Sequence, residues 1–310
     1  MSAVQYIRGA RGGARPRAVR WLAGVLGAGL LLASCGTAPG AAAVVDGVRI
    51  SEQVVQDRAQ ALVSENVPAE QTATIDPVSW AGLNRYQVND AVRHQLVLAA
   101  AKDQRISVGP AEIDSFIAQH KDDSTPLAVQ LTVPAATLRN AVYDLLAVRK
   151  LAAKLPAAGM NVTNVSVKLD AVLVGDRDAA IAARTRYQSD PGALDADAAA
   201  ARAAGQAPPQ DESLLTNPDD AVFGLFSAPK DQVVLISQGT SGYYVARVTQ
   251  RTTTQAKLTK DMLTSASSLG GEQVLGTLLL SKYATDVTIN PRFGQWDAQM
   301  MLVVPSNNGL

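Results

Sequence analysis

The sequence of 310 residues predicts an α+β protein that is mostly helical. Apolar residues recur at helical spacing over long stretches, most clearly between Ser79 and Arg105. Residues 165–173 instead alternate between apolar and polar side chains, which is typical of a half-buried strand. The composition is rich in alanine and only 5% aromatic, which favours helices over sheets.

The first 34 residues have the form of a secretory signal. Five arginines and no acidic residue precede an apolar run from Trp21 to Leu32, which is shorter than the roughly 20 residues that a membrane-spanning helix needs. The segment Leu32-Ala33-Ser34-Cys35 that ends this run resembles a bacterial lipobox. That resemblance implies cleavage before Cys35, lipidation of its thiol, and a protein held at the extracytoplasmic face of the cell membrane. The alternative is an ordinary signal peptide cleaved near Ala33 or Ala38.

Charge and cysteine content restrict the class of protein further. Removal of the signal arginines leaves 23 basic residues against 28 acidic ones, and no basic stretch survives. This balance argues against a nucleic-acid partner. Cys35 is the only cysteine, so an exported chain without disulfides needs a substantial hydrophobic core.

The chain after the signal divides into segments of different pattern. A short tether, 35–43, leads into a helical unit over 44–156, which opens with an Asp46-Gly47 hairpin turn and a Ser51 helix cap. Within this unit we expect helices after Ser51, at 79–105, from Pro110, and at 134–154, with a polar link over 121–133. A second unit covers 162–250, a C-terminal helix and strand cover 255–295, and residues 296–310 form a tail.

Two stretches of the helical unit resemble the SurA/PrsA-type extracytoplasmic foldases. The run Val44-Val45-Asp46-Gly47-Val48-Arg49-Ile50-Ser51 is similar to the start of their mature chains. The block from His94 to Asp114 is similar to their N-terminal domain, although Arg105 stands where that family commonly has glycine. The resemblance implies a helical chaperone domain that the C-terminal segment completes, with Val287 and Ile289 paired beside Val44-Val45.

The second unit resembles a parvulin-type peptidyl-prolyl isomerase domain in its predicted β-α-α-α-β-β order. Ala221-Val222-Phe223-Gly224-Leu225 and the segment from Ser241 to Val248 carry this resemblance. It implies an inserted domain with a core of its own. It also implies an apolar cup for client polypeptides lined by Val172, Phe223, Phe226 and Tyr244.

The polar centre of a parvulin isomerase is missing from the sequence. The family's two histidines fall on Ala171 and Tyr244, and a slip of one residue places Asp170 at the first position. His94 and His120 are the only histidines, and both lie outside this unit. We therefore predict no catalytic residue, and the sequence contains no clustered ligands for a metal and no motif for a cofactor.

These features together predict a lipid-anchored extracytoplasmic chaperone that binds unfolded or newly exported polypeptides. Two alternatives stay open. The chain could be an active parvulin-type isomerase that relies on its apolar cup, or an envelope scaffold or binding lipoprotein without client polypeptides.

Overall fold

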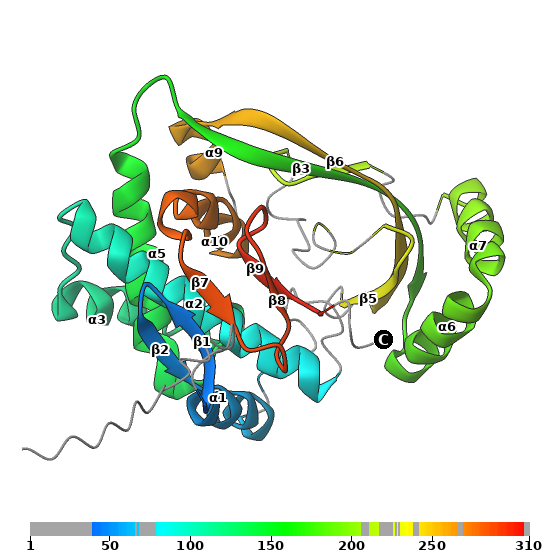
Figure 1. The fold of residues 1–310 in the computed structure, drawn as a ribbon, viewed down its shortest axis with the longest axis horizontal. Helices are drawn as coiled ribbons and strands as arrows, with labels where there is room; N and C mark the ends of the chain where they lie inside the picture. The colour runs from blue at the N-terminus through cyan, green and yellow to red at the C-terminus, as the bar shows by residue number, and fades with distance from the viewer. Residues whose placement is uncertain are drawn as a thin grey trace, which may run out of the picture. The chain divides into compact units, whose positions relative to one another are not determined.

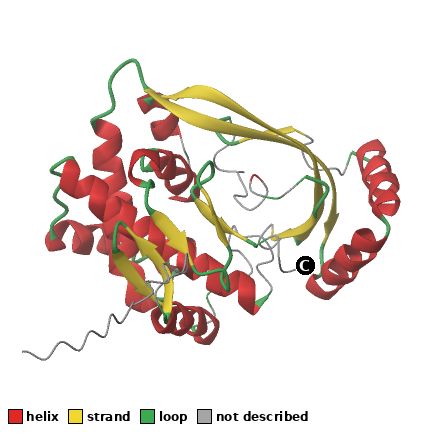
Figure 2. Cartoon of the chain, viewed as in Figure 1, coloured by secondary structure: helices red, strands yellow, loops and turns green. Residues whose placement is uncertain are grey.

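A computed structural model gives the fold of the chain (Figure 1). The structure describes residues 39–65, 67, 79–205, 211–216, 226, 228, 230–237, 242–265 and 269–306. Helices and antiparallel sheets are both present, which confirms the mixed α+β prediction (Figure 2). Cys35 and the predicted signal lie outside the described residues. Within those residues, no helix combines the length and apolarity needed to cross a membrane.

The N-terminal part is a hairpin followed by helices. Its helices lie close to the predicted ranges, although the supposed polar link after α3 contains the short helix α4 and three buried apolar side chains, Leu127, Leu131 and Val133. The elements are β1 (Ala41–Val45), β2 (Val48–Ser51), α1 (Glu52–Ser64), α2 (Trp80–Asp103), α3 (Pro110–Gln119), α4 (Leu127–Gln130), η2 (Ala135–Thr137) and α5 (Leu138–Ala153).

The turn and cap predicted from the sequence are both present. Asp46 and Gly47 have φ angles of 46° and 77°, and two positive φ angles define the type I′ turn that suits the twist of a hairpin. The Ser51 Oγ accepts a hydrogen bond from the Gln53 N–H at 3.2 Å. The chain therefore passes directly from β2 into α1.

Strand β1 is the central strand of a three-stranded sheet with the order β2-β1-β7, where β7 is Val287–Ile289. Val45 pairs with Val287 and Ala43 with Ile289, as expected. The tether prediction is wrong over residues 41–43, because these three alanines lie in β1 and are fully buried. Small side chains let the α2 helix pack closely on this strand, and strand pairing on both sides fixes its backbone.

The middle of the chain forms a four-stranded antiparallel sheet with the order β4-β3-β6-β5. Strands β3 and β6 are longer than predicted and run side by side over their whole length (Figure 1). The short strand β4 replaces part of a predicted loop, and the helix predicted at 219–226 lies outside the described residues except for Phe226. The elements are β3 (Met160–Val174), α6 (Arg177–Ser189), α7 (Pro191–Ala203), β4 (Asp211–Ser213), β5 (Val233–Ser237) and β6 (Tyr243–Leu258).

The C-terminal helix expected within residues 255–295 is described as α9 and α10, and residues 266–268 between them lie outside the described residues. The segment predicted as a tail contains a hairpin, β8 with β9, whose Met300 and Val303 are buried. The elements are α9 (Lys260–Ser265), α10 (Leu269–Leu278), η4 (Ser281–Tyr283), β7, β8 (Gln295–Asp297) and β9 (Leu302–Val304).

The main hydrophobic core extends from the helices onto one face of the long sheet. It joins Val92 and Leu96 of α2 with Val165 and Val167 of β3 and with Val303 of the C-terminal hairpin. A smaller core lies between the opposite face of the sheet and helices α6 and α7. The expectation that residues 162–250 have a core entirely of their own is therefore wrong, since half of that core is shared.

Helices α5 and α10 approach each other closely at Gly276. A Cβ atom added there would lie 2.3 Å from the Val148 Cγ1, well inside van der Waals contact. The missing side chain is thus what permits this crossing, which attaches the C-terminal helix to the N-terminal part of the chain.

We expect Gly276→Ala to lower the free energy of unfolding by about 1–3 kcal/mol, the usual cost of overpacking a core. Gly175→Ala is the matched control, because an added Cβ there meets nothing within 4 Å. Urea denaturation measures both. The destabilisation should shrink when Val148→Ala is combined with Gly276→Ala, and strictly additive effects would contradict the proposed close contact.

Candidate functional site

The residues predicted to line one apolar cup lie on opposite faces of the long sheet. Ala171 belongs to the main core, whereas the neighbouring Val172 packs in the smaller core with Tyr187 and Leu194 of α6 and α7. Successive residues of a strand point to opposite faces, and Tyr244 packs on the side of the main core. The prediction that Val172 shares a cup with Tyr244 is therefore wrong.

Phe226 is also not available as a client contact. Its side chain is completely buried in the main core. Its backbone carbonyl accepts a hydrogen bond from the Arg251 Nε at 2.8 Å. Phe226 is thus a core residue, and the prediction that it contacts clients is wrong. Phe223, the other predicted phenylalanine, lies outside the described residues.

The accessible apolar surface on this face is a cross-strand pair that the sequence prediction only half identified. Leu173 of β3 lies opposite Tyr244 of β6. The Leu173 side chain is 45% exposed, which is unusual for a leucine in a sheet, and Tyr244 is half-buried. The alternation over residues 165–173 placed Leu173 on the same face as Ala171, and this signal could have identified it. The pair offers an apolar contact whose one polar side-chain group is the Tyr244 hydroxyl.

The position of the first missing histidine carries no acid–base group in the structure. Ala171 is buried and pairs with Ala246, so only methyl groups meet there. Asp170, the alternative position, belongs to the opposite side of the strand, where its carboxylate pairs with Arg202 at 3.0 Å and Arg247 at 3.2 Å. A carboxylate held between two guanidinium groups is engaged in structure rather than poised to transfer a proton.

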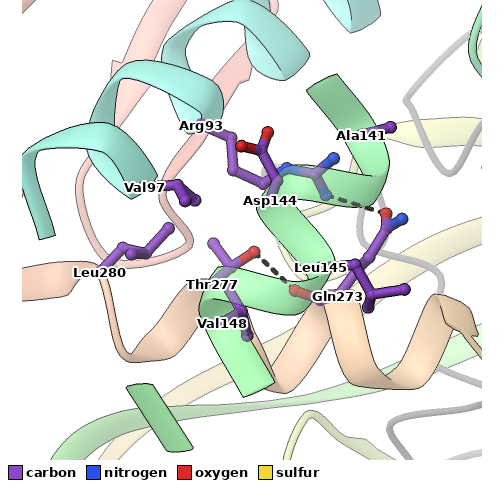
Figure 3. Close-up of a pocket in the computed structure, with 9 residues that line it drawn as sticks. All are labelled: Arg93, Val97, Ala141, Asp144, Leu145, Val148, Gln273, Thr277 and Leu280. Carbon is purple, nitrogen blue, oxygen red and sulfur yellow. Dashed lines mark hydrogen bonds between the residues drawn. The ribbon is translucent and has the colours of Figure 1, made fainter. Parts of the chain in front are cut away.

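A small cavity lies between α2, α5 and α10 (Figure 3). The Arg93 Nη1 donates a hydrogen bond to the Gln273 Oε1 at 2.9 Å across its wall. Its interior leaves about 10 Å³ for the centre of a water-sized sphere, which is the lower limit for a single water molecule. The cavity is therefore too small for a substrate. It is lined by Arg93, Val97, Ala141, Asp144, Leu145, Val148, Gln273, Thr277 and Leu280.

His94 and Asp144 form a partly buried pair beside this cavity, with 2.8 Å between the His94 Nδ1 and the Asp144 Oδ1. Burial lowers the pKa of His94, but the hydrogen bond and the charge of Asp144 together outweigh it, so the pKa lies above its ordinary value. Burial raises the pKa of Asp144 as well. The pair joins α2 to α5, which indicates a structural role.

A wider hollow of about 260 Å³ lies along the edge strand β4. Most of its lining residues are polar. The Lys168 Nζ lies 3.6 Å from the Asp211 Oδ1, and this ion pair adds little stability because both side chains are exposed. Its hydroxyl, amide and charged side chains suit weak polar contacts. It is lined by Ser166, Val167, Lys168, Asp211, Glu212, Ser213, Thr216, Gln250 and Thr252.

Comparisons with known proteins assign the chain to no family. No protein-family model matches the chain, and no curated protein matches it either. In the part of the chain that the structure describes, no group of three or more histidine, cysteine, aspartate or glutamate side chains could hold a metal ion.

The raised pKa of His94 predicts that the folded protein loses stability as pH rises. The folded state binds the His94 proton more tightly than the unfolded chain, so this stabilisation is complete below the unfolded pKa of about 6.5 and disappears as pH rises through the folded pKa. The raised pKa of Asp144 acts in the same direction at lower pH. We expect His94→Gln to flatten the fall in unfolding free energy as pH rises above about 6.

Urea denaturation at a series of pH values measures this effect. His120→Gln is the matched control, because His120 lies in a surface pair with Asp123 and not between helices. An equally steep fall in wild type and His94→Gln would contradict the assignment.

Proposed function

We propose that this protein is a lipid-anchored extracytoplasmic chaperone of the SurA/PrsA type that binds unfolded or newly exported polypeptides. The observation that carries the proposal is the antiparallel pairing of β1 with β7. It brings the two ends of the chain into one sheet, and the β3–β6 sheet unit lies between them in the sequence. That arrangement is the one expected of a helical chaperone domain with an inserted parvulin-like domain.

The order of elements in the inserted unit supports a parvulin-like domain. Strand β3 is followed by helices α6 and α7 and then by the antiparallel strands β5 and β6. The short strand β4 is added between α7 and β5, and the third helix of the predicted β-α-α-α-β-β order falls on residues 219–226, of which only Phe226 is described.

The chemistry of the exposed face favours binding over catalysis. Rotation about a peptide bond has a barrier of about 18–20 kcal/mol, and an isomerase must favour the twisted amide with well-placed polar groups. Here the buried Ala171–Ala246 pair lies beside the exposed Leu173, and neither alanine can donate or accept a hydrogen bond through its side chain. An apolar contact of this kind holds extended segments weakly and tolerates variation in their sequence.

Holding and isomerisation can be separated in two assays. In a protease-coupled assay with Xaa-Pro peptides the protein should stay near background, while it slows the aggregation of an unfolded client. Leu173→Lys places a charge on the exposed apolar contact and should weaken holding several-fold. Ile181→Lys is the matched control, since Ile181 is similarly exposed at 36% but lies on α6.

Two outcomes would overturn this assignment. Robust isomerase turnover that disappears in Tyr244→Phe would make the protein an enzyme with Tyr244 as its catalytic group. Absence of any effect on aggregation would favour an envelope scaffold or binding lipoprotein.

The anchor has a separate test. Cys35→Ala removes the only thiol that can carry a lipid and should shift the protein from the detergent phase to the aqueous phase on phase partitioning. Lipid chains contribute about 0.8 kcal/mol per buried CH₂, so two or more chains give durable attachment. Wild-type protein in the aqueous phase would rule out the anchor.

A further inference from the structure

The C-terminal hairpin has the composition of a chaperone client. Residues 300–304 are Met-Met-Leu-Val-Val, an uninterrupted apolar run, and four of the five side chains are buried in the protein. Methionine is unbranched and adapts to irregular surfaces. This segment therefore occupies an apolar surface that any similar extended segment could cover.

The hairpin is held on α2 through its backbone. The Asn89 side-chain amide donates to the Val303 carbonyl oxygen at 3.4 Å and accepts a hydrogen bond from the Val303 N–H. One side chain thus satisfies both backbone groups of one strand residue, as a neighbouring strand would. Such contacts are independent of the side chain at the bound position, which is the mode used to recognise extended peptides.

A second contact ties the hairpin to the long sheet. The Arg251 guanidinium lies 3.4 Å from the Asp297 carboxylate and also donates to the Phe226 carbonyl oxygen. Arg251 belongs to β6 and Asn89 to α2, so the hairpin lies against both the helical part and the inserted sheet unit. The surface beneath it is the shared core described above.

The hairpin can leave without breaking the other described sheets. Strands β8 and β9 are three residues each and form a sheet of their own, so their release breaks no pairing with another described strand. A two-stranded hairpin of this size is marginally stable without its packing surface, and elements with few pairings open readily.

We propose that this hairpin, residues 295–304, occupies the principal client-binding surface, and that an extended apolar segment of an unfolded polypeptide binds there by displacing it. The inference rests on the proposed chaperone function and assigns that function a second and larger contact surface than Leu173 and Tyr244. The freed surface would present apolar core side chains together with the Asn89 amide and the Arg251 guanidinium. Those groups match an extended apolar strand that needs its backbone hydrogen bonds satisfied.

The test compares four unlipidated chains that begin at residue 35 and carry Cys35→Ser: the otherwise unchanged chain, one that ends at Gly294, Asp297→Ala, and Asn290→Ala. Asp297 lies on the hairpin and pairs with Arg251, so its loss loosens the hairpin and leaves the freed surface intact. Asn290→Ala is the matched control, because Asn290 donates to the Ala41 carbonyl oxygen and to Glu52, away from β9. The probe is fluorescently labelled, reduced and carboxymethylated α-lactalbumin, which stays unfolded in solution. Fluorescence anisotropy gives its Kd for each chain.

We expect the chain that ends at Gly294 to bind the probe at least about 10-fold more tightly. A 10-fold change means that the hairpin leaves the surface free about one tenth of the time in the unchanged chain. Asp297→Ala should bind several-fold more tightly, and Asn290→Ala should match the unchanged chain. Equal Kd values for all four chains would overturn the competition and leave the proposed chaperone function standing. No measurable binding by any of them would overturn both.

Hydrogen exchange supplies a readout that does not depend on the folding of the shortened chain. Saturating probe should increase exchange of the amides of residues 300–304 in the unchanged chain, while β1 amides stay protected. Unchanged protection of those residues when the probe is bound would contradict displacement. Dimers of the unchanged chain that account for increased exchange would also overturn the proposal, since a second copy would then be the occupant.

Discussion

The structure depends on one long antiparallel pairing. All 15 residues of β3 pair with β6, from Met160 opposite Leu258 to Val174 opposite Tyr243. At one end of this pair of strands, β3 follows α5 and β6 leads into α9. At the other end, the smaller core lies between the strands and helices α6 and α7. The same pair of strands therefore determines both which side chains join the main core and which remain accessible. Thr249 of β6 is an extra residue between the partners of Lys168 and Leu169, and this bulge shifts the register of the two strands by one residue.

Elements with a strong local signal could be predicted from the sequence. Helices α2 and α5 have apolar stripes long enough to define a buried face, and the Asp46-Gly47 turn has the residues that two positive φ angles require. The elements that were missed have no such signal. Strand β6 extends through a polar run of threonine and glutamine from Gln250 to Gln255 because β3 supplies a partner, and β4, β8 and β9 are too short to show alternation. Each of these strands forms because a partner strand is available in the folded protein, and not because its own residues strongly favour a strand.

The candidate site was harder to predict than the fold, because a strand changes face with every residue. The missing acid–base groups could be recognised from composition alone, since two histidines cannot supply a polar centre in a unit that contains neither. The shape of the apolar contact surface could not be predicted from the sequence. Val172 and Ala171 are neighbours in sequence but belong to different cores, and Phe226 is fully buried. Only the register of β3 against β6 shows that Leu173 and Tyr244 face the same side and that Leu173 is exposed.

The position of β1 between β2 and β7 has a consequence for biosynthesis. A chain made from its N-terminus delivers β1 and its hairpin partner early, but β7, which completes the sheet, follows much later in the sequence. Until β7 is made, one edge of β1 is an open template for foreign strands, and closing so long a loop carries a large entropic cost. Synthesis of β7 is thus the step that lets the nascent sheet close and protects its open edge.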